Sequence, residues 1–201
     1  MSKSFDAYIV GLGGQGVLTI GELLAEAGLQ KGLPVKFYPT KGMSQRGGFV
    51  QGQLRFGREN IGPSLPGMSA DLVVSMERSE SLKGVKYATR GGEFLIYDDA
   101  WLTTAVVTKK AAYPELGDVL KEIKEACATL YYISGDKIPK MDGVPVRVNM
   151  YILGALLSNT ALKSLFTLEE IIAVTKEAFH KDAGSNIAAL EAGYASVLEP
   201  V

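Results

Sequence analysis

The chain has 201 residues, of which 47% are hydrophobic and 21% are charged, and its formal net charge is −1 at pH 7. This length supports one sizeable core, so we expect a single domain over residues 1–201. The small net charge argues against general nucleic-acid binding and no apolar run reaches the roughly 18 residues of a membrane span, so neither nucleic acid nor a membrane is an expected partner.

Residues 1–6 carry no apolar signal-peptide core, and the expected location is therefore the cytoplasm. The chain has one cysteine, Cys127, and one histidine, His180. This inventory excludes a disulfide framework. It also excludes an iron–sulfur cluster or a structural zinc ion held by this chain alone.

A glycine-rich turn, residues 11–16, lies between a predicted strand and a predicted helix. Residues 8–10 form a short apolar run, and residues 17–30 carry apolar positions at helical spacing. Glycine allows positive φ and close approach of a ligand, while the following helix offers unpaired N–H groups and the positive end of its dipole. We therefore expect the backbone of residues 13–16 to bind a phosphate or a carboxylate.

Two nucleotide-binding patterns fit this turn only in part. Its first, third and sixth residues match the dinucleotide pattern G-x-G-x-x-G, which also requires an acid at the end of the second strand. The expected second strand, residues 34–38, is followed by Pro39-Thr40-Lys41 and no acid. A phosphate-binding loop would need a lysine and a Ser/Thr where Val17-Leu18 stand. The alternative to an anion site is a tight turn that only packs the helix against the sheet.

The next strand alternates in polarity. Gln51, Gln53 and Arg55 occupy one face of residues 49–56 and apolar residues the other, which predicts a half-buried strand. Turn residues follow, so we expect residues 49–63 to form a β-hairpin added to a parallel sheet.

Four cations and no acid lie in the segment from residue 41 to residue 58, namely Lys41, Arg46, Arg55 and Arg58. If the glycine-rich loop at residues 40–48 and the first turn both follow carboxyl ends of neighbouring strands, they face one crevice. Arg46 would then bind the same anion as the turn. The alternative is a solvated loop with scattered charges.

The remaining pattern predicts further strands and helices. Strands are expected at residues 71–75, 93–97 and 129–134, helices at 79–87, 116–128, 148–159, 168–180 and 185–198, and a β-rich segment at 101–110. Thr167 and Glu170 form the capping box that opens one of these helices. The fold class is thus α/β, with a doubly wound, mostly parallel, Rossmann-like sheet, an inserted β-hairpin and a helical C-terminus.

Other polar residues are weaker candidates. Asp98 and Asp99 end a strand, but adjacent carboxylates point in different directions and often cap a turn. Glu77 also follows a strand, without an identifiable partner. Cys127 lies on the apolar side of its helix and is expected to be inert, and His180 is expected to be a cation at a helix end. No catalytic residue is assigned.

The two glycine stretches together resemble a known family. Gly11-Leu12-Gly13-Gly14-Gln15-Gly16 followed by Gly42-Met43-Ser44-Gln45-Arg46-Gly47-Gly48 is similar to the paired signature of the gamma-type subunit of 2-oxoacid:ferredoxin oxidoreductases, the pyruvate/ketoisovalerate oxidoreductase family. The similarity continues through Asp71-Leu72 and includes Asn149, Gly154, Asn186 and Gly193. The cofactor-binding residues expected from it are Gly11, Gly13, Gly14, Gln15, Gly16, Met43, Ser44, Gln45, Arg46, Gly47 and Gly48.

The resemblance implies an activity that this chain does not perform alone. In this family thiamine diphosphate attacks the 2-oxoacid, electrons pass through [4Fe-4S] clusters to ferredoxin, and coenzyme A takes the acyl group. Thiamine diphosphate, magnesium and the clusters would belong to partner subunits, and ferredoxin would dock on the complex. This chain would hold no tightly bound cofactor, would be inactive alone, and would contribute to the coenzyme A side of the reaction.

The second stretch is similar to the indolepyruvate (aryl pyruvate) branch of the family. The same role in a pyruvate, 2-oxoglutarate or branched-chain 2-oxoacid enzyme is the alternative within the family. Two other classes stay open, a nucleotide-dependent oxidoreductase and an assembly module whose glycine loops only make subunit contacts.

Overall fold

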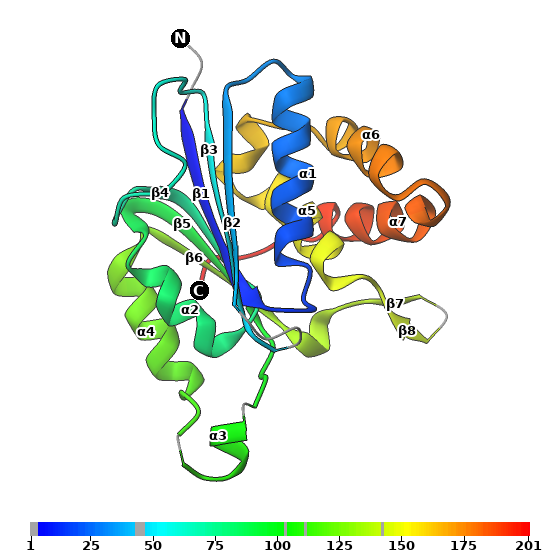
Figure 1. Cartoon of the computed structure of the whole chain (residues 1–201). Helices are drawn as coiled ribbons and strands as arrows, with labels where there is room; N and C mark the ends of the chain where they lie inside the picture. Colours follow the sequence, from blue (N-terminus) through cyan, green and yellow to red (C-terminus); the bar gives the residue numbers. More distant parts are fainter. Residues whose placement is uncertain (1–3, 43–46, 103, 111, 142) are drawn as a thin grey trace.

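A computed structural model describes residues 4–42, 47–102, 104–110, 112–141 and 143–201 of the chain. Its main sheet has six strands in the order β2-β3-β1-β4-β5-β6 (Figure 1). The strands are β1 (Phe5–Leu12), β2 (Val35–Lys41), β3 (Phe49–Phe56), β4 (Ala70–Ser75), β5 (Ala88–Asp98) and β6 (Thr129–Ser134). Strands β1, β4, β5 and β6 are parallel neighbours, and β3 runs antiparallel to both β1 and β2.

Helices cover both faces of this sheet, which confirms the doubly wound α/β class. The α-helices of the described residues are α1 (Val17–Gln30), α2 (Arg78–Val85), α3 (Thr104–Val107), α4 (Leu116–Ala126), α5 (Val148–Asn159), α6 (Leu168–Phe179) and α7 (Ala183–Tyr194), of which α3 lies away from the sheet (Figure 1). Alternate residues of β1 belong to different cores: Ile9 is part of the cluster that includes residues of α1, α5, α6 and α7, whereas Val10 is part of the cluster that includes residues of α2 and α4. These two sets of helices lie on opposite faces of the sheet (Figure 1). None of the helices within the described residues is long and apolar enough to cross a lipid bilayer.

The hairpin is real, but its predicted position at residues 49–63 is wrong. Strand β3 pairs with the preceding strand β2, from Val35↔Phe56 to Lys41↔Val50, and residues 57–69 contain no strand. Pro63 could not donate to a ladder, whereas Pro39 is tolerated because β2 is an edge strand. The second glycine stretch is therefore the connection of the β2–β3 hairpin.

Strand β3 is also buried on both faces, where a half-buried strand was expected. Gln53 and Arg55 are buried because residues 57–69 fold over their face of the sheet. The Leu65 N–H donates to Gln53 Oε1 at 2.6 Å, and Arg55 donates to the carbonyl oxygens of Gly62 and Ser64, each at 3.2 Å. Their polar side chains thus stabilise a loop.

Three helices at the C-terminus agree with the prediction, with small shifts at their ends. The capping box of α6 is present: Thr167 Oγ1 accepts from the Glu170 N–H at 3.3 Å, and Glu170 Oε2 accepts from the Thr167 N–H at 2.9 Å. Helices α5 and α7 cross at Gly154 and Gly193, where a Cβ on either glycine would lie 1.9 Å from a carbonyl oxygen of the other helix. These two glycines therefore set how closely the helices pack.

Short elements complete the chain. They are the 3₁₀ turns Gly135–Lys137, Ala161–Ser164 and His180–Asp182, and the two-residue strands β7 (Lys140–Met141) and β8 (Val144–Pro145). The β-rich prediction for residues 101–110 is wrong, because this segment projects beyond the end of β5 and contains the short helix α3 (Figure 1). There it has no strand to pair with.

Candidate functional site

The glycine turn, residues 13–16, joins β1 to α1. Gly14 and Gly16 have φ of 104° and 77°, a conformation that favours glycine. Gly16 is the N-cap of α1, and a Cβ at this position would lie 2.5 Å from Nδ2 of Asn149 in α5. Glycine is thus required here for the backbone conformation and for the approach of α5.

The side chain of Gln15 fixes this turn to the ends of two other strands. Its Oε1 accepts from the Leu12 N–H at 2.8 Å, and its Nε2 donates to the Met76 carbonyl at 2.8 Å and to Asp99 Oδ2 at 3.0 Å. A Cβ on Gly11 would lie 2.8 Å from Gln15 Oε1, so Gly11 leaves room for the Gln15 side chain.

The two glycine stretches meet, as expected for one crevice. The Gly13 N–H donates to the Gly48 carbonyl at 2.8 Å, and the Gly47 N–H donates to the Gly13 carbonyl at 3.3 Å. The two glycine stretches lie side by side because Phe49, at the start of β3, pairs with Leu12, at the end of β1. Met43, Ser44, Gln45 and Arg46 lie outside the described residues, and the role of Arg46 stays a prediction.

Only part of the expected anion cradle is free to bind. The Gly13 N–H is donated to Gly48, and the Gln15 N–H is donated to the Leu12 carbonyl at 3.2 Å. Within the described part of the chain, the N–H groups of Gly14 and Gly16 have no protein acceptor.

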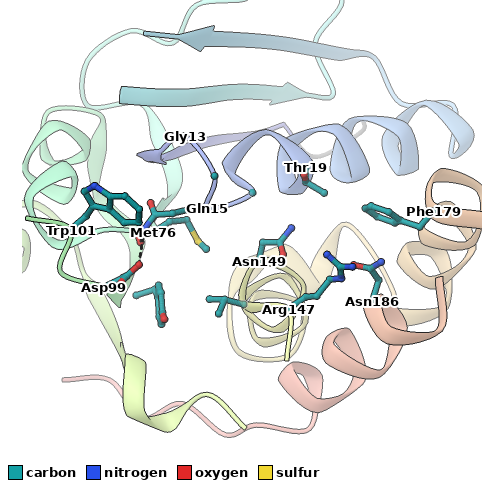
Figure 2. A pocket seen from close by; sticks show the side chains of 14 residues that line it. Gly13, Gln15, Thr19, Met76, Asp99, Trp101, Arg147, Asn149, Phe179 and Asn186 are labelled. Carbon is teal, nitrogen blue, oxygen red and sulfur yellow. Dashed lines mark hydrogen bonds between the residues drawn. The ribbon is translucent and has the colours of Figure 1, made fainter. Parts of the chain in front are cut away.

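A cavity of about 640 Å³ opens beside the turn, and we call it the glycine pocket (Figure 2). Its walls come from the glycine turn and α1, from the carboxyl ends of β4 and β5, and from α5, α6 and α7. It is lined by Gly13, Gly14, Gln15, Gly16, Thr19, Met76, Tyr97, Asp99, Trp101, Arg147, Val148, Asn149, Phe179 and Asn186. Its place at the carboxyl edge of the sheet is where doubly wound folds bind ligands.

Two helix N-termini face the glycine pocket, and neither is capped by a side chain. The N-cap of α1 is Gly16 and that of α5 is Arg147, and both helices lack an acidic residue in the first turn. Helices α2 and α6 point elsewhere and are capped by Glu77 and Thr167. The unpaired N–H groups and positive dipole ends of α1 and α5 therefore favour an anion in the pocket.

Arg147 adds a full positive charge to the same wall. Its side chain is exposed and lines the glycine pocket near Asn149 and Asn186 (Figure 2). Among the described residues, no carboxylate lies within 4.0 Å of its guanidinium group. A cation is electrostatically unfavourable at a helix N-terminus, so an anion bound between Arg147 and the dipole would relieve this repulsion.

The adjacent carboxylates Asp98 and Asp99 point in different directions, as predicted. Asp98 accepts two bonds from Arg78, at 2.7 and 2.9 Å, and a third from the Tyr132 hydroxyl at 2.9 Å. Burial acts to raise the pKa of Asp98, but these hydrogen bonds outweigh burial and lower it. Asp99 instead faces the glycine pocket and is held by Gln15. In the described ranges, no three His, Cys, Asp or Glu side chains are grouped to bind a metal.

A sequence model of the family described as pyruvate ferredoxin/flavodoxin oxidoreductase matches residues 6–196, which is nearly the whole chain. The chain belongs to this family. The resemblance based on the two glycine stretches is thereby confirmed.

Two curated relatives named as indolepyruvate oxidoreductase subunits match most of this chain and most of their own length. The chain is 28% identical to the indolepyruvate oxidoreductase subunit IorB of Archaeoglobus fulgidus over 92% of both chains. It is 33% identical to the IorB subunit of Thermococcus kodakarensis over 77% of both chains. In fold it is similar to a 2-oxoglutarate:ferredoxin oxidoreductase from Magnetococcus marinus, solved with 2-oxoglutarate, coenzyme A and succinyl-CoA bound. That match has a TM-score of 0.68 and 21% identity and covers 97% of this chain and 31% of that chain.

Two of the four cationic residues in the segment 41–58 lie away from the glycine pocket. Arg55 and Arg58 donate to buried Asp6, at 3.1 and 3.5 Å, and Asp6 lies at the amino end of β1. Strand β3 runs antiparallel to β1 and therefore carries these two arginines to the opposite edge of the sheet. Lys41 borders a neighbouring hollow of about 500 Å³ on the other side of the glycine turn.

Three further sequence candidates are structural. Glu77, for which the sequence identified no partner, is buried, and its carboxylate caps α2. Cys127 ends α4 and is half-buried, and burial raises the pKa of its thiol, in agreement with an inert residue. His180 caps the C-terminus of α6, as predicted.

Sequence reasoning did not find Arg147, Trp101 or Phe179, which line the pocket. One signal for Arg147 was available. It directly precedes the predicted helix 148–159, and a cation at that position opposes the helix dipole unless an anion binds there. Trp101 and Phe179 had no such signal, because tertiary structure alone brings them to the turn.

Proposed function

We propose that this chain, as a single domain over residues 1–201, is the thiamine-free and cluster-free subunit of a 2-oxoacid:ferredoxin oxidoreductase that forms acyl-coenzyme A. The glycine pocket binds the phosphate groups of coenzyme A. Indolepyruvate or another aryl pyruvate is the 2-oxoacid, which the naming of the IorB relatives supports. The coenzyme A bound in the Magnetococcus marinus enzyme supports the choice of cosubstrate.

One observation carries the proposal. The uncapped N-termini of α1 and α5 and the guanidinium group of Arg147 face one cavity. Coenzyme A presents a diphosphate and a 3′-phosphate, whose charges suit this wall. Trp101, Met76 and Phe179 offer apolar and aromatic surface for the rest of the molecule, and a volume of about 640 Å³ is typical of ligand sites.

The residues of this chain do not fit the other groups of such an enzyme. A [4Fe-4S] cluster requires four thiolate ligands, whereas the sequence contains one cysteine. Asp99 is the one carboxylate among the described lining residues, which is too few for a magnesium–diphosphate site. Partner subunits therefore hold the clusters, magnesium and thiamine diphosphate and deliver electrons to ferredoxin. This chain binds and orients coenzyme A and excludes water.

The sheet order disfavours a nucleotide-dependent oxidoreductase. In a dinucleotide site, the residue after the second strand lies beside the glycine turn and binds the ribose. Here β3 lies between β1 and β2, so the end of β2 is one strand removed from the turn, and it carries no acid.

Equilibrium binding of coenzyme A tests the proposal, with the full chain and with the complex recovered anaerobically from its host. We expect Arg147→Ala to weaken binding about tenfold, the effect of losing one charge-assisted contact. Arg90→Ala, which removes an exposed arginine of β5 outside the pocket, is the matched control. Dephospho-coenzyme A and pantetheine, which lack one or all of the phosphates, should bind progressively more weakly.

Two results would contradict the proposal. Equal binding by the wild-type chain, Arg147→Ala and Arg90→Ala would remove the pocket as the phosphate site. Loss of complex assembly in Arg46→Ala with unchanged coenzyme A affinity would assign the glycine loops to the subunit interface instead.

A further inference from the structure

We propose that Glu77 is a positioning residue that holds Trp101 as a wall of the glycine pocket. The inference concerns how the pocket is built, and it rests on the proposed function only in taking this pocket as the coenzyme site. It follows from the contacts of one buried carboxylate.

Glu77 lies between β4 and α2, and its side chain is fully buried. Its Oε2 accepts from the Glu80 N–H at 2.8 Å and from the Ser79 hydroxyl at 2.6 Å, which caps α2. Its Oε1 accepts from the Tyr113 hydroxyl and from the backbone N–H of Trp101, the latter at 3.4 Å. All four partners are donors, so both carboxylate oxygens are used as acceptors.

The Oε1 contacts span a long loop. Trp101 and Tyr113 stand at the two ends of the projecting segment that contains α3, and one oxygen atom contacts both. Arg78 strengthens the anchor, since its N–H donates to the Asp99 carbonyl at 3.2 Å and its guanidinium group lies 5.5 Å from the Tyr113 ring centre. Burial and the bond to Glu77 raise the pKa of the Tyr113 phenol, which therefore remains a donor.

The anchored Trp101 connects this carboxylate to the turn. Its indole lines the glycine pocket, and its Nε1 lies 3.1 Å from the position that a Cβ on Gly47 would occupy. Gly47 in turn donates to the Gly13 carbonyl. Glu77 therefore holds the backbone of the residue whose indole lines the pocket beside the glycine turn. Figure 2 shows Trp101 on this side of the pocket.

Tryptophan fluorescence can measure how firmly Trp101 is held, because Trp101 is the single tryptophan of the chain. Its side chain is 47% exposed, so a release from Glu77 can still increase its contact with a quencher. In the full-length chain without ligand, Tyr113→Phe should at least double the acrylamide quenching constant, and Glu77→Gln should have the same or a larger effect. Tyr113→Phe leaves the cap of α2 intact, so the test stands even where Glu77→Gln does not fold.

Tyr131→Phe is the matched control. It removes a hydroxyl that donates to the Asn159 carbonyl at 2.9 Å, on a strand that does not line the pocket. Unchanged quenching in folded Tyr113→Phe, or an equal increase in Tyr131→Phe, would overturn the inference. With coenzyme A as the probe, Tyr113→Phe should also raise KM in the complex and leave kcat unaltered. If the wild-type chain binds no coenzyme A while the quenching changes as expected, the proposed function fails and the role of Glu77 stands.

Discussion

Gly13 and Gly48 are joined backbone to backbone, with the Gly13 N–H donating to the Gly48 carbonyl at 2.8 Å. This bond ties the strand-to-helix turn to the hairpin loop and uses one of the N–H groups that an anion would otherwise receive. Anion binding as proposed for this site therefore depends on the next residues of the turn, Gly14 and Gly16, and on the N-terminus of α5.

Gly16→Ala should lower the unfolding free energy by more than the cost of placing alanine at a positive φ. Alanine at a φ of 77° costs about 1–2 kcal/mol of unfolding free energy, and the new Cβ would also displace Asn149 from the pocket. Gly32→Ala is the matched control, since Gly32 has a φ of 72° with open space around it. Urea unfolding should show a larger loss for Gly16→Ala, and coenzyme A affinity should fall only in this variant. Equal losses of unfolding free energy in Gly16→Ala and Gly32→Ala would mean that the close approach of Asn149 to Gly16 does not affect stability.

Arg147→Ala should weaken ligand binding and yet stabilise the free chain. The cation stands at the N-terminus of α5, where it opposes the helix dipole, so its removal should raise the unfolding free energy by about 0.3–1 kcal/mol at low ionic strength. Lys176→Ala should have the opposite sign, because Lys176 lies in the last turn of α6. Added salt should reduce both effects. Destabilisation of the free chain by Arg147→Ala would indicate a structural partner for this arginine.

Local pattern was sufficient to predict several elements. The helices at residues 17–30 and 148–159 have the predicted bounds, because their spacing of apolar residues and their flanking residues determine them locally. The capping box of Thr167 and Glu170 was equally readable. The glycine turn was placed correctly for the same reason.

The sequence could not show what β3 pairs with or what surrounds the turn. Strand pairing is non-local, and the place of β3 between β1 and β2 depends on contacts such as that of Arg55 with Asp6, 49 residues apart. The proposed anion site likewise depends on the N-termini of α1 and α5 bordering the same pocket. Arg147 follows the turn by more than 130 residues, so no local pattern could connect the two.

The buried pair of Asp6 and Arg55 should matter for stability and not for binding. Asp6→Asn would leave the guanidinium group buried without its carboxylate, which typically costs about 3–5 kcal/mol. The pair lies at the opposite end of β1 from the pocket, so coenzyme A affinity should not change in the folded fraction. Arg58→Ala removes a side chain that is itself 40% exposed and that contacts Asp6 at 3.5 Å, so it should cost less than about 1 kcal/mol. Weaker coenzyme A binding by folded Asp6→Asn or Arg58→Ala would mean that this charged group contributes to the ligand site.

Asp98 should make stability depend on pH in the acid range. Its pKa is lowered from 3.8, so the unfolded chain takes up the proton more readily than the folded one. The stabilisation is full above pH 3.8 and is lost as the pH falls through the lower pKa of the folded state. Asp98→Asn should therefore cost about 2 kcal/mol at pH 7, and progressively less below pH 4. Urea unfolding of both proteins at several pH values measures this, and a difference that stays constant down to pH 3 would contradict it.

Two glycines of α7 should respond in opposite ways to the same substitution. Gly184→Ala adds a methyl group in open space on a helix and should stabilise the chain by about 0.5–1 kcal/mol. Gly193→Ala would place its Cβ 1.9 Å from the Tyr151 carbonyl in α5, so the helices must separate and the chain should lose about 3 kcal/mol or more. Because α5 carries Arg147 and Asn149 to the pocket, Gly193→Ala should also weaken coenzyme A binding at temperatures where it is folded. If both variants kept wild-type stability and affinity, the α5–α7 contact would not be what places the anion-binding wall.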